Sequence, residues 1–311
     1  MKRIALLLAL AALPAAAQIK VGIIGLDTSH VIAFTKILND PKNPDHVPGA
    51  KVVAAYPGGS PDIASSRDRL EGYTNQLKNE FGVEIVPDIA TLLKKVDVVL
   101  LESVDGRKHL EQVKPVFAAG KRVFIDKPLA STLEDAREIA RLGKQHNTPW
   151  WSSSSLRYSK AVSDVKVEGL TGAISWGPAS YEPTHQLDLS WYGIHPVELL
   201  YSVMGPGCKR VERIYHEGWD VITGEWADGR LGVVRTIREG KKDYGVVAFG
   251  EKEIKVSTDA GGAYGPLLRN VVEFFKTGKP PVPNEVTLEI FAFMDAAQRS
   301  KQQGGAKVEL R

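Results

Sequence analysis

The chain of 311 residues is poor in cysteine and has no block of basic residues. Its one cysteine, Cys208, cannot form an internal disulfide, so in an oxidising compartment it would remain a buried or free thiol. No Cys-x-x-Cys or other zinc pattern occurs, which argues against a structural metal site. The formal net charge of +3 is spread along the sequence, so neither nucleic acid nor a membrane surface is indicated as a partner.

The first seventeen residues have the pattern of a secretory signal peptide. Lys2 and Arg3 precede an apolar run at residues 4–13, and small residues at positions 15–17 suit cleavage before Gln18. The apolar run is too short for a transmembrane span. Because no twin-arginine pair is present, the expected export route is the one that carries unfolded chains. We therefore expect a periplasmic or extracellular protein that acquires any cofactor after export.

Short apolar runs alternate with amphipathic segments from residue 19 onward, as expected for a parallel sheet covered by helices on both faces. The strand-like runs are residues 19–24, 51–56, 83–86, 96–101 and 122–125. Five or six such strand and helix units predict an α/β fold, with a Rossmann-like doubly wound domain over residues 18–150.

The helices between these runs are predicted from spacing and capping residues. Residues 29–41 carry apolar side chains at helical intervals and end at a proline. Asp88 begins a short helix that ends near Lys95. Ser131 and Glu134 form a capping-box pattern at the start of a helix that runs to about residue 145.

The pattern changes after residue 150. Longer β-rich stretches at residues 224–239 and 244–257 are separated by short polar turns, which indicates an antiparallel sheet. Helical segments follow at residues 267–276 and 285–302. We expect residues 151–311 to form a second, α+β domain for substrate binding and oligomerisation, with an open antiparallel sheet and a last helix that packs back.

Three segments, in this order, resemble the Gfo/Idh/MocA family, which includes glucose-fructose oxidoreductase and inositol dehydrogenase. Residues 96–130 resemble the family's strand, helix and strand that end in Glu-Lys-Pro, here Asp126-Lys127-Pro128. Residues 191–200, Trp-Tyr-Gly-Ile-His-Pro-Val-Glu-Leu-Leu, resemble the helix that carries the family's catalytic histidine. Residues 264–283 and the final helix resemble the C-terminal return. The resemblance covers nearly the whole mature chain.

This resemblance implies an NAD(P)-dependent oxidoreductase that acts on a CH–OH group of a sugar, polyol or glycoside. Carried over by motif position, Lys127 lies near the nicotinamide and the substrate hydroxyl, and His195 is the acid or base. Oxidation of a secondary alcohol needs a base for the hydroxyl proton and a cation for the oxygen, and imidazole titrates near neutrality. The resemblance also allows a homodimer through the face of the C-terminal sheet.

The dinucleotide fingerprint departs from the family pattern G-x-G-x-x-G. Residues 25–30 read Gly-Leu-Asp-Thr-Ser-His, so only Gly25 remains. We expect Asp27 to crowd and repel a pyrophosphate, unless Asp27, Thr28 or Ser29 serves only as a helix cap.

The end of the second strand also lacks the acid that binds the ribose hydroxyls in NAD-specific proteins. Residues 56–61 offer a serine instead, and Arg67 is nearby, so a 2′-phosphate could bind. The cofactor is therefore expected to be NAD or NADP, or to be absent.

The candidate site residues fall into three sets. The catalytic candidates are Lys127 and His195. The cofactor candidates are Gly25, Asp27, Thr28, Ser29, His30, Glu102, Asp126 and Lys127. The substrate candidates are Arg157, His185, Trp191 and Glu198, of which Glu198 matches an acidic family position one turn after the histidine, whereas Trp191 replaces an aspartate. No metal ligands are assigned, because no compact ligand motif argues for the divalent ion that the acids and histidines could hold.

Two other functions use the same residues. Acids, bases and histidines at the carboxyl ends of the strands, including Asp27, Glu102 and His185, could instead catalyse proton abstraction beside a carbonyl. That predicts a non-redox carbohydrate lyase or hydratase using His30, Lys127 and His195. A saccharide-binding module would use aromatic side chains as stacking platforms: Trp150, Trp151, Trp176 and Trp191. In each case the partner is a small carbohydrate.

Overall fold

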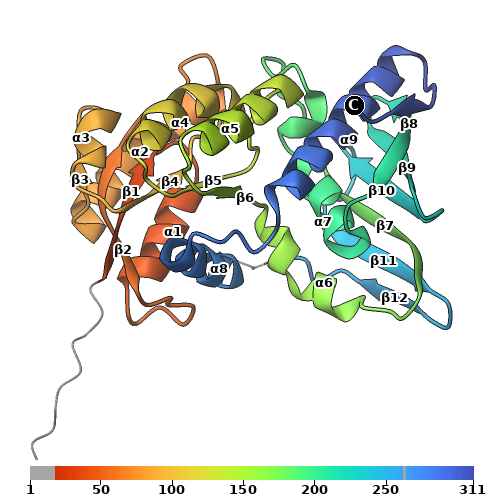
Figure 1. The fold of residues 1–311 in the computed structure, drawn as a ribbon, viewed down its shortest axis with the longest axis horizontal. Coiled ribbons are helices and arrows are strands. Elements are labelled where there is room, and N and C mark those ends of the chain that lie inside the picture. Colours follow the sequence, from red (N-terminus) through yellow and green to blue (C-terminus); the bar gives the residue numbers. More distant parts are fainter. Residues whose placement is uncertain (1–17, 262–263) are drawn as a thin grey trace, which may run out of the picture.

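The computed structural model describes residues 18–261 and 264–311, so the predicted signal peptide lies outside the described residues. Two sheets make up the chain, one of six strands and one of seven. In Figure 1 the six-stranded sheet with its helices forms one lobe and the seven-stranded sheet forms the other. Among the described residues, no helix combines the length and the apolar character needed to cross a membrane.

The first sheet is parallel throughout and has the strand order β3-β2-β1-β4-β5-β6. Its strands are β1 (Ile19–Ile24), β2 (Ala50–Tyr56), β3 (Glu84–Ile85), β4 (Val98–Leu101), β5 (Val123–Ile125) and β6 (Trp150–Ser152). All five predicted strands are present, and the doubly wound fold is confirmed. Because the chain order reverses between β1 and β4, a ligand crevice is expected beyond the carboxyl ends of these two strands.

Helices cover both faces of this sheet (Figure 1). They are α1 (His30–Asn39), α2 (Ala64–Phe81), α3 (Ile89–Leu93), the 3-10 helix η1 (Gly106–Lys108), α4 (His109–Ala118) and α5 (Leu133–Gln145). Asp88 caps α3 as predicted, accepting a hydrogen bond from Thr91 N. The capping prediction for α5 is wrong by one residue: Thr132 has the extended backbone of an N-cap and accepts from Asp135 N, so Ser131 lies outside the helix.

The second sheet has the order β12-β11-β7-β10-β9-β8-β13. Its strands are β7 (Leu170–Pro178), β8 (Cys208–His216), β9 (Trp219–Trp226), β10 (Leu231–Ile237), β11 (Gly245–Gly250), β12 (Ile254–Ser257) and β13 (Val308–Glu309). Neighbouring strands are antiparallel except β7 and β10, so the sheet is mixed rather than purely antiparallel. The elements η2 (Ser155–Tyr158), α6 (Lys160–Asp164), η3 (Asp188–Ser190) and α7 (Ile194–Met204) connect the two sheets or cover the second.

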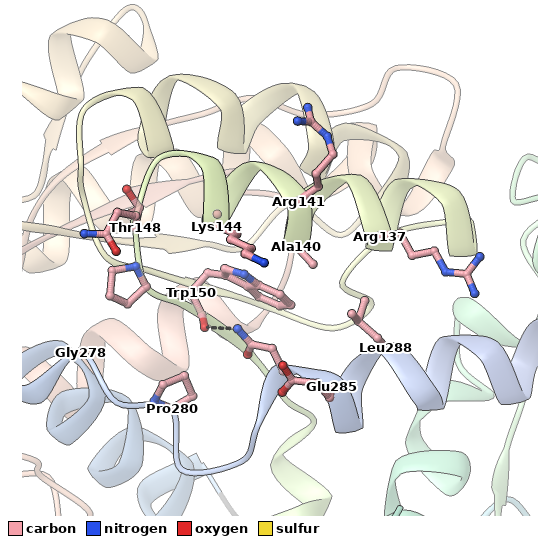
Figure 2. A pocket seen from close by; sticks show the side chains of 14 residues that line it. Arg137, Ala140, Arg141, Lys144, Thr148, Trp150, Gly278, Pro280, Glu285 and Leu288 are labelled. Carbon is pink, nitrogen blue, oxygen red and sulfur yellow. Dashed lines mark hydrogen bonds between the residues drawn. The ribbon is translucent and has the colours of Figure 1, made fainter. Parts of the chain in front are cut away.

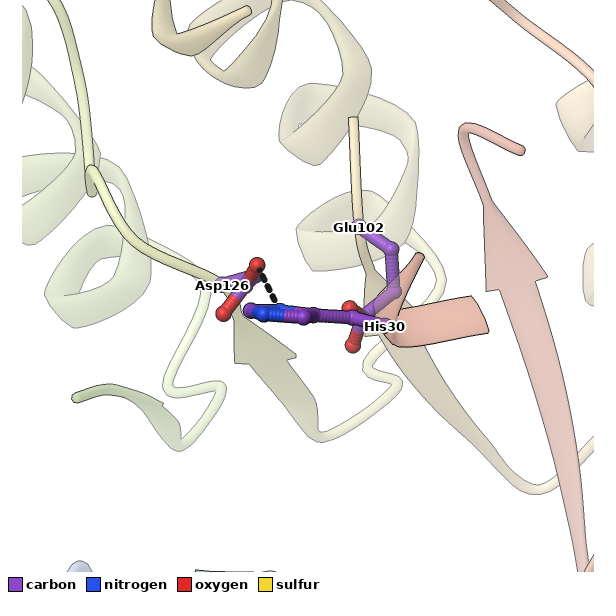
Figure 3. A group of neighbouring side chains, drawn as sticks. All are labelled: His30, Glu102 and Asp126. Atoms are coloured by element: carbon purple, nitrogen blue, oxygen red, sulfur yellow. Dashed lines mark hydrogen bonds and ion pairs between the residues drawn. The ribbon is translucent and has the colours of Figure 1, made fainter. Parts of the chain in front are cut away.

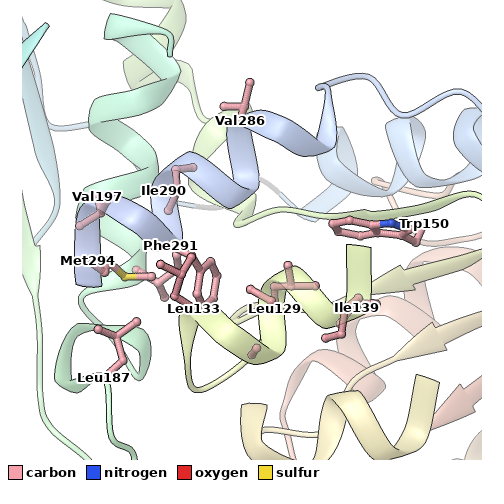
Figure 4. Close-up of a cluster of buried hydrophobic side chains, with 14 of the residues drawn as sticks. Leu129, Leu133, Ile139, Trp150, Leu187, Val197, Val286, Ile290, Phe291 and Met294 are labelled. Atoms are coloured by element: carbon pink, nitrogen blue, oxygen red, sulfur yellow. The ribbon is translucent and has the colours of Figure 1, made fainter. Parts of the chain in front are cut away.

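The last two helices return to the first lobe. Helix α8 (Tyr264–Thr277) packs on α1, and α9 (Asn284–Gln302) lies between α5 and β8. Phe274 and Phe275 of α8 share one buried apolar cluster with Phe34 of α1. Figure 4 shows a second cluster, in which side chains of α9 such as Phe291 face Leu133 of α5. The apolar core is therefore continuous across the two lobes.

The tryptophans of β6 belong to this core. Trp151 is fully buried and packs against Phe124 and Phe274, and Trp150 is 4% exposed. The ring of Trp151 therefore has no free face for a sugar, which removes it from the predicted stacking platforms, and Trp150 exposes little surface. Cys208 is a buried free cysteine, as expected, and burial raises the pKa of its thiol to about 12.

Candidate active site

The predicted acid and base residues lie where strands of the first sheet end. His30 begins α1 shortly after β1, Glu102 directly follows β4, and Asp126 and Lys127 directly follow β5. The carboxyl ends of parallel strands meet at one edge of the sheet, so these side chains share one crevice although up to 97 positions separate them.

Lys127 and His195 both lie beside the ring of Tyr192. The Nζ atom of Lys127 is 5.4 Å from the ring centroid of Tyr192, and the His195 ring is 5.9 Å from the same centroid. Tyr192 is 37% exposed, so this arrangement opens toward solvent. A cation and an imidazole beside one accessible surface form an acid and base pair for a hydroxyl or carbonyl oxygen.

Ser154 holds the imidazole of His195 in place. His195 Nδ1 lies 2.8 Å from Ser154 Oγ, which leaves Nε2 for a substrate. Burial, followed by the positive charges of Lys127 and His30, holds the pKa of His195 well below its usual range. At neutral pH His195 is therefore an uncharged imidazole and can accept a proton.

Glu198 and Arg157 are connected to this histidine through Ser154. Glu198 accepts hydrogen bonds from Ser153 Oγ at 2.6 Å, from Ser154 N at 2.8 Å and from Arg157 Nε at 2.9 Å. Because Ser154 is also the partner of His195, the carboxylate fixes the backbone that positions the imidazole. Both residues were predicted to bind substrate; the structure places them behind the histidine. The two serines were missed, although four consecutive serines at residues 152–155 directly follow the last apolar strand of the first sheet.

His30, Glu102 and Asp126 form a compact buried cluster, which Figure 3 shows from close by. His30 Nδ1 lies 2.7 Å from Asp126 Oδ2. Neither carboxylate oxygen of Glu102 has a hydrogen-bond partner among the described residues, and the side chain is fully buried. Burial raises the pKa of Glu102 well above its usual value, and the nearby Asp126 carboxylate raises it further. Burial alone would raise the pKa of Asp126 too, but the charges of His30 and Lys127 lower it.

Tyr264 closes one side of this cluster and comes from helix α8. Its ring centroid lies 5.0 Å from His30 and 5.4 Å from Phe34. Burial raises the pKa of Tyr264 to about 12, and the carboxylates of Asp126 and Glu102 add to the shift. The sequence carried no signal for this residue, because nothing local shows that α8 returns to α1.

Asp27 joins two loops across the crevice. Its side chain accepts from Ser66 Oγ at 2.6 Å and from Val104 N at 2.9 Å, and it is fully buried. Burial raises the pKa of Asp27 against the effect of these hydrogen bonds. The β1–α1 loop is thus tied directly to the loop after β4, between the two strands where a pyrophosphate lies in Rossmann domains. Asp27 occupies this position as expected, but with partners of its own.

The predicted 2′-phosphate site is not formed. Ser60 Oγ donates to Asp105 Oδ2 at 2.6 Å, and Arg67 Nε pairs with Asp68 on the surface. His185 lies near the same aspartate, with its Nε2 3.6 Å from Asp105 Oδ1, and Trp191 packs on the His185 ring at 5.0 Å. These two substrate candidates therefore lie together beside Asp105, and the Trp191 ring also lies 6.2 Å from the ring of Tyr192, which neighbours Lys127 and His195.

Three features still fit a dinucleotide. Gly25 has a φ of +86°, and a Cβ atom there would collide with Ser103, so the tight turn of the fingerprint is kept. A cavity of about 300 Å³ lies beyond the end of β2, lined by residues that include Tyr56, Gly58, Gly59 and Gln112. This is where an adenosine lies in Rossmann domains. Thr28 and exposed Ser29 stand at the start of α1, where helix termini favour anions.

The fit of the crevice to a dinucleotide therefore differs from one part of the crevice to another. The turn, the helix start and the adenosine cavity suit a dinucleotide, and binding its pyrophosphate requires the bridge from Asp27 to Val104 to open.

A larger groove of about 650 Å³ lies elsewhere, between α5 and the connection from α8 to α9 (Figure 2). Pro149 and Trp150 place it at the amino-terminal end of β6, opposite the carboxyl edge of the sheet. Trp150, one of the predicted stacking platforms, lines it, and none of the catalytic, cofactor or substrate candidates does.

In comparisons with known proteins, the most direct sequence match is to the first lobe. Residues 19–152 match the Gfo/Idh/MocA family, described as an oxidoreductase family with an NAD-binding Rossmann fold. A 1,5-anhydro-D-fructose reductase from Ensifer adhaerens is 31% identical over 114 residues, which cover 35% of this chain and 33% of that protein. The chain thus aligns with about a third of the length of this curated relative.

Solved structures match over nearly the whole chain. GenD2 from gentamicin A biosynthesis, in complex with NAD, has a TM-score of 0.76 at 16% identity and covers 97% of this chain and 100% of its own. The myo-inositol dehydrogenase from Lactobacillus casei, in complex with NAD(H) and myo-inositol, has a TM-score of 0.74 at 16% identity, with 95% and 97% covered. At these identities the likeness shows the fold. Residues 19–152 thus match the Gfo/Idh/MocA family of NAD-binding oxidoreductases, and the whole chain has the fold of these solved structures.

Proposed function

We propose that this protein is an exported oxidoreductase that acts on a CH–OH group of a sugar, polyol or glycoside, with NAD or NADP as the hydride carrier. The observation that carries the proposal is the placement of Lys127 and His195 beside the same exposed ring, that of Tyr192. The family match of residues 19–152 and the named relatives, which include a sugar reductase and a polyol dehydrogenase, support the substrate class. Export is supported by the sequence of residues 1–17 alone.

His195 and Lys127 have different roles in the proposed reaction. His195, uncharged and held by Ser154, takes the hydroxyl proton from the substrate on Nε2. The Lys127 ammonium stabilises the oxygen as its proton leaves. A bound nicotinamide supplies the hydride acceptor for the carbinol carbon.

Two measurements on the mature protein test the proposal. NADH or NADPH fluorescence should titrate with the folded protein, and absence of binding at millimolar cofactor contradicts the redox function. Lys127→Met and His195→Gln should each lower turnover of a responsive sugar or polyol by about 100-fold or more, as expected for loss of an acid or base. The matched controls are Lys144→Met and His146→Gln, both on or next to the far end of α5, and these should retain activity.

The bridge made by Asp27 favours a second candidate function. With the centre of the crevice crossed by side-chain hydrogen bonds, the same His195 and Lys127 could abstract a proton next to a carbonyl without any nucleotide. This second candidate function is that of a carbohydrate lyase or hydratase. Its test is release of an unsaturated or hydrated product from an oxidised sugar with no nucleotide added, and failure across a panel of keto-sugars counts against it.

We propose that two copies of the chain form a homodimer through the solvent-exposed face of the second sheet. Exposed apolar side chains gather on its strands: Ile214, Leu231, Ile254 and Val256. Light scattering of the purified protein tests this assembly.

A further inference from the structure

The buried cluster of His30, Glu102 and Asp126 contains a carboxylate that the fold does not satisfy. Glu102 follows the apolar strand β4, is fully buried, and has no hydrogen-bond partner for either oxygen within the described residues. An unpaired buried carboxylate is costly, and native proteins rarely retain one without a counterpart. Figure 3 shows this side chain turned toward His30, next to Asp126.

The three residues have the spacing of a ligand set. One ligand atom from each lies within 4.8 Å of the other two, and His30 Nδ1 and Asp126 Oδ2 are already 2.7 Å apart. Metal bonds of about 2.1 Å place neighbouring ligand atoms about 3.0–3.4 Å apart. Small side-chain movements therefore suffice to bring all three onto one ion.

The backbone of the two acidic residues is fixed. Glu102 N donates to Ile24 O at 2.7 Å, and Asp126 N donates to Leu101 O at 2.8 Å. Both acids are thus anchored to the central strands of the sheet, so little conformational freedom is lost when they coordinate an ion.

We propose that His30, Glu102 and Asp126 bind a divalent cation at the carboxyl edge of the first sheet. Two carboxylates balance the charge of the ion, and the imidazole favours Zn²⁺ or Mn²⁺ over Mg²⁺ and Ca²⁺. Three protein ligands leave further coordination positions for water or for an oxygen atom of a ligand. The site lies in the same crevice as Lys127 and His195, but its occupancy does not depend on which reaction takes place there.

Metal binding is tested on the mature protein without substrate or nucleotide, so that its outcome is separate from that of the proposed function. After removal of metals with a chelator, calorimetric titration with Zn²⁺ and with Mn²⁺ should show one site per chain. Glu102→Gln, Asp126→Asn and His30→Gln should each weaken binding by about 100-fold or more, because each removes one of three ligands. Glu138→Gln, a matched change at an exposed carboxylate on α5, should leave binding intact.

Glu102→Gln is the decisive variant, since it keeps the size of the side chain and removes a buried charge, and circular dichroism verifies its fold. A wild-type protein that binds neither Zn²⁺ nor Mn²⁺ at millimolar concentration would overturn the proposal and leave a proton as the counterpart of Glu102. Binding that is unchanged in folded Glu102→Gln would overturn it equally.

Discussion

The Oγ atom of Ser154 lies 2.8 Å from Nδ1 of His195, so a residue just beyond the last strand of the first sheet orients an imidazole on a helix of the second lobe. Ser154→Ala should lower kcat about tenfold with little change in KM, since one orienting hydrogen bond is lost. Steady-state kinetics on a responsive sugar or polyol measures this. Ser153→Ala serves as comparison, because that hydroxyl bonds Glu198 and not the imidazole; an equal effect of both changes would speak against an orienting role for Ser154.

The protonation of His195 should depend on Lys127. Burial and the charges of Lys127 and His30 lower the pKa of the imidazole, whereas Asp126 raises it. The uncharged form therefore persists as the pH falls through the usual histidine range, and protonation occurs only at lower pH. In Lys127→Met one positive charge is gone, so the pKa should rise. NMR titration of the His195 Cε1–H resonance measures both values, and a pKa that stays the same or falls in the variant contradicts this electrostatic coupling.

Asp27 should stabilise the folded protein and at the same time restrict access of NADH to the crevice. Asp27→Gly removes two buried hydrogen bonds, leaves Val104 N and Ser66 Oγ without their partner, and should lower the free energy of unfolding by about 2–4 kcal/mol. The same change restores a fingerprint glycine and should tighten NADH binding. Chemical denaturation and fluorescence titration measure the two effects. Asp27→Asn, which keeps the bridge, should bind NADH like the wild type; NADH binding that is no tighter in Asp27→Gly shows that Asp27 is not the obstacle.

Arg213 should be essential for the stability of the second lobe. Its guanidinium is fully buried and pairs with Asp188 at 2.9 Å and with Asp220 at 3.1 Å. Arg213→Met removes the cation shared by buried Asp220 and partly exposed Asp188. These carboxylates keep Arg238 and Lys301 as partners, so the free energy of unfolding should fall by about 2–4 kcal/mol. Thermal or urea denaturation measures the loss. Arg141→Met, at an exposed pair with Glu138, should cost less than about 1 kcal/mol, and a similar loss in both variants would be inconsistent with the burial argument.

The start of α5 offers a test of the corrected cap. Thr132 accepts a hydrogen bond from Asp135 N at 3.0 Å, whereas Ser131 lies one residue before the cap. Thr132→Ala should therefore cost about 1 kcal/mol of stability, and Ser131→Ala should cost much less. Urea denaturation of the two variants decides between the positions, because the reverse order would restore Ser131 as the cap.

Local sequence patterns predicted the parts of this fold that depend on neighbours in the chain. The apolar runs of the parallel strands are readable because a buried strand leaves a short signature, and Lys127 and His195 were identified by their resemblance to family motifs. The residues that contact the site residues could not be predicted in this way. Ser66 and Val104 are 39 and 77 positions from Asp27, and Tyr264 reaches His30 only through the return of α8. Such contacts follow from tertiary packing, on which local spacing carries no information.

The packing of α8 on α1 also determines when the first lobe can finish folding. Phe274 and Phe275 fill the same apolar cluster as Phe34, and Tyr264 walls the crevice, so the first lobe has an unfinished face until this helix arrives. Residues 18–152 expressed alone would present that face to water and should aggregate or remain incompletely folded. Because α8 follows the whole second sheet in the chain, the crevice is complete only when residues from beyond that sheet have packed on α1, and the division into two sheets is not a division into two independent folding units.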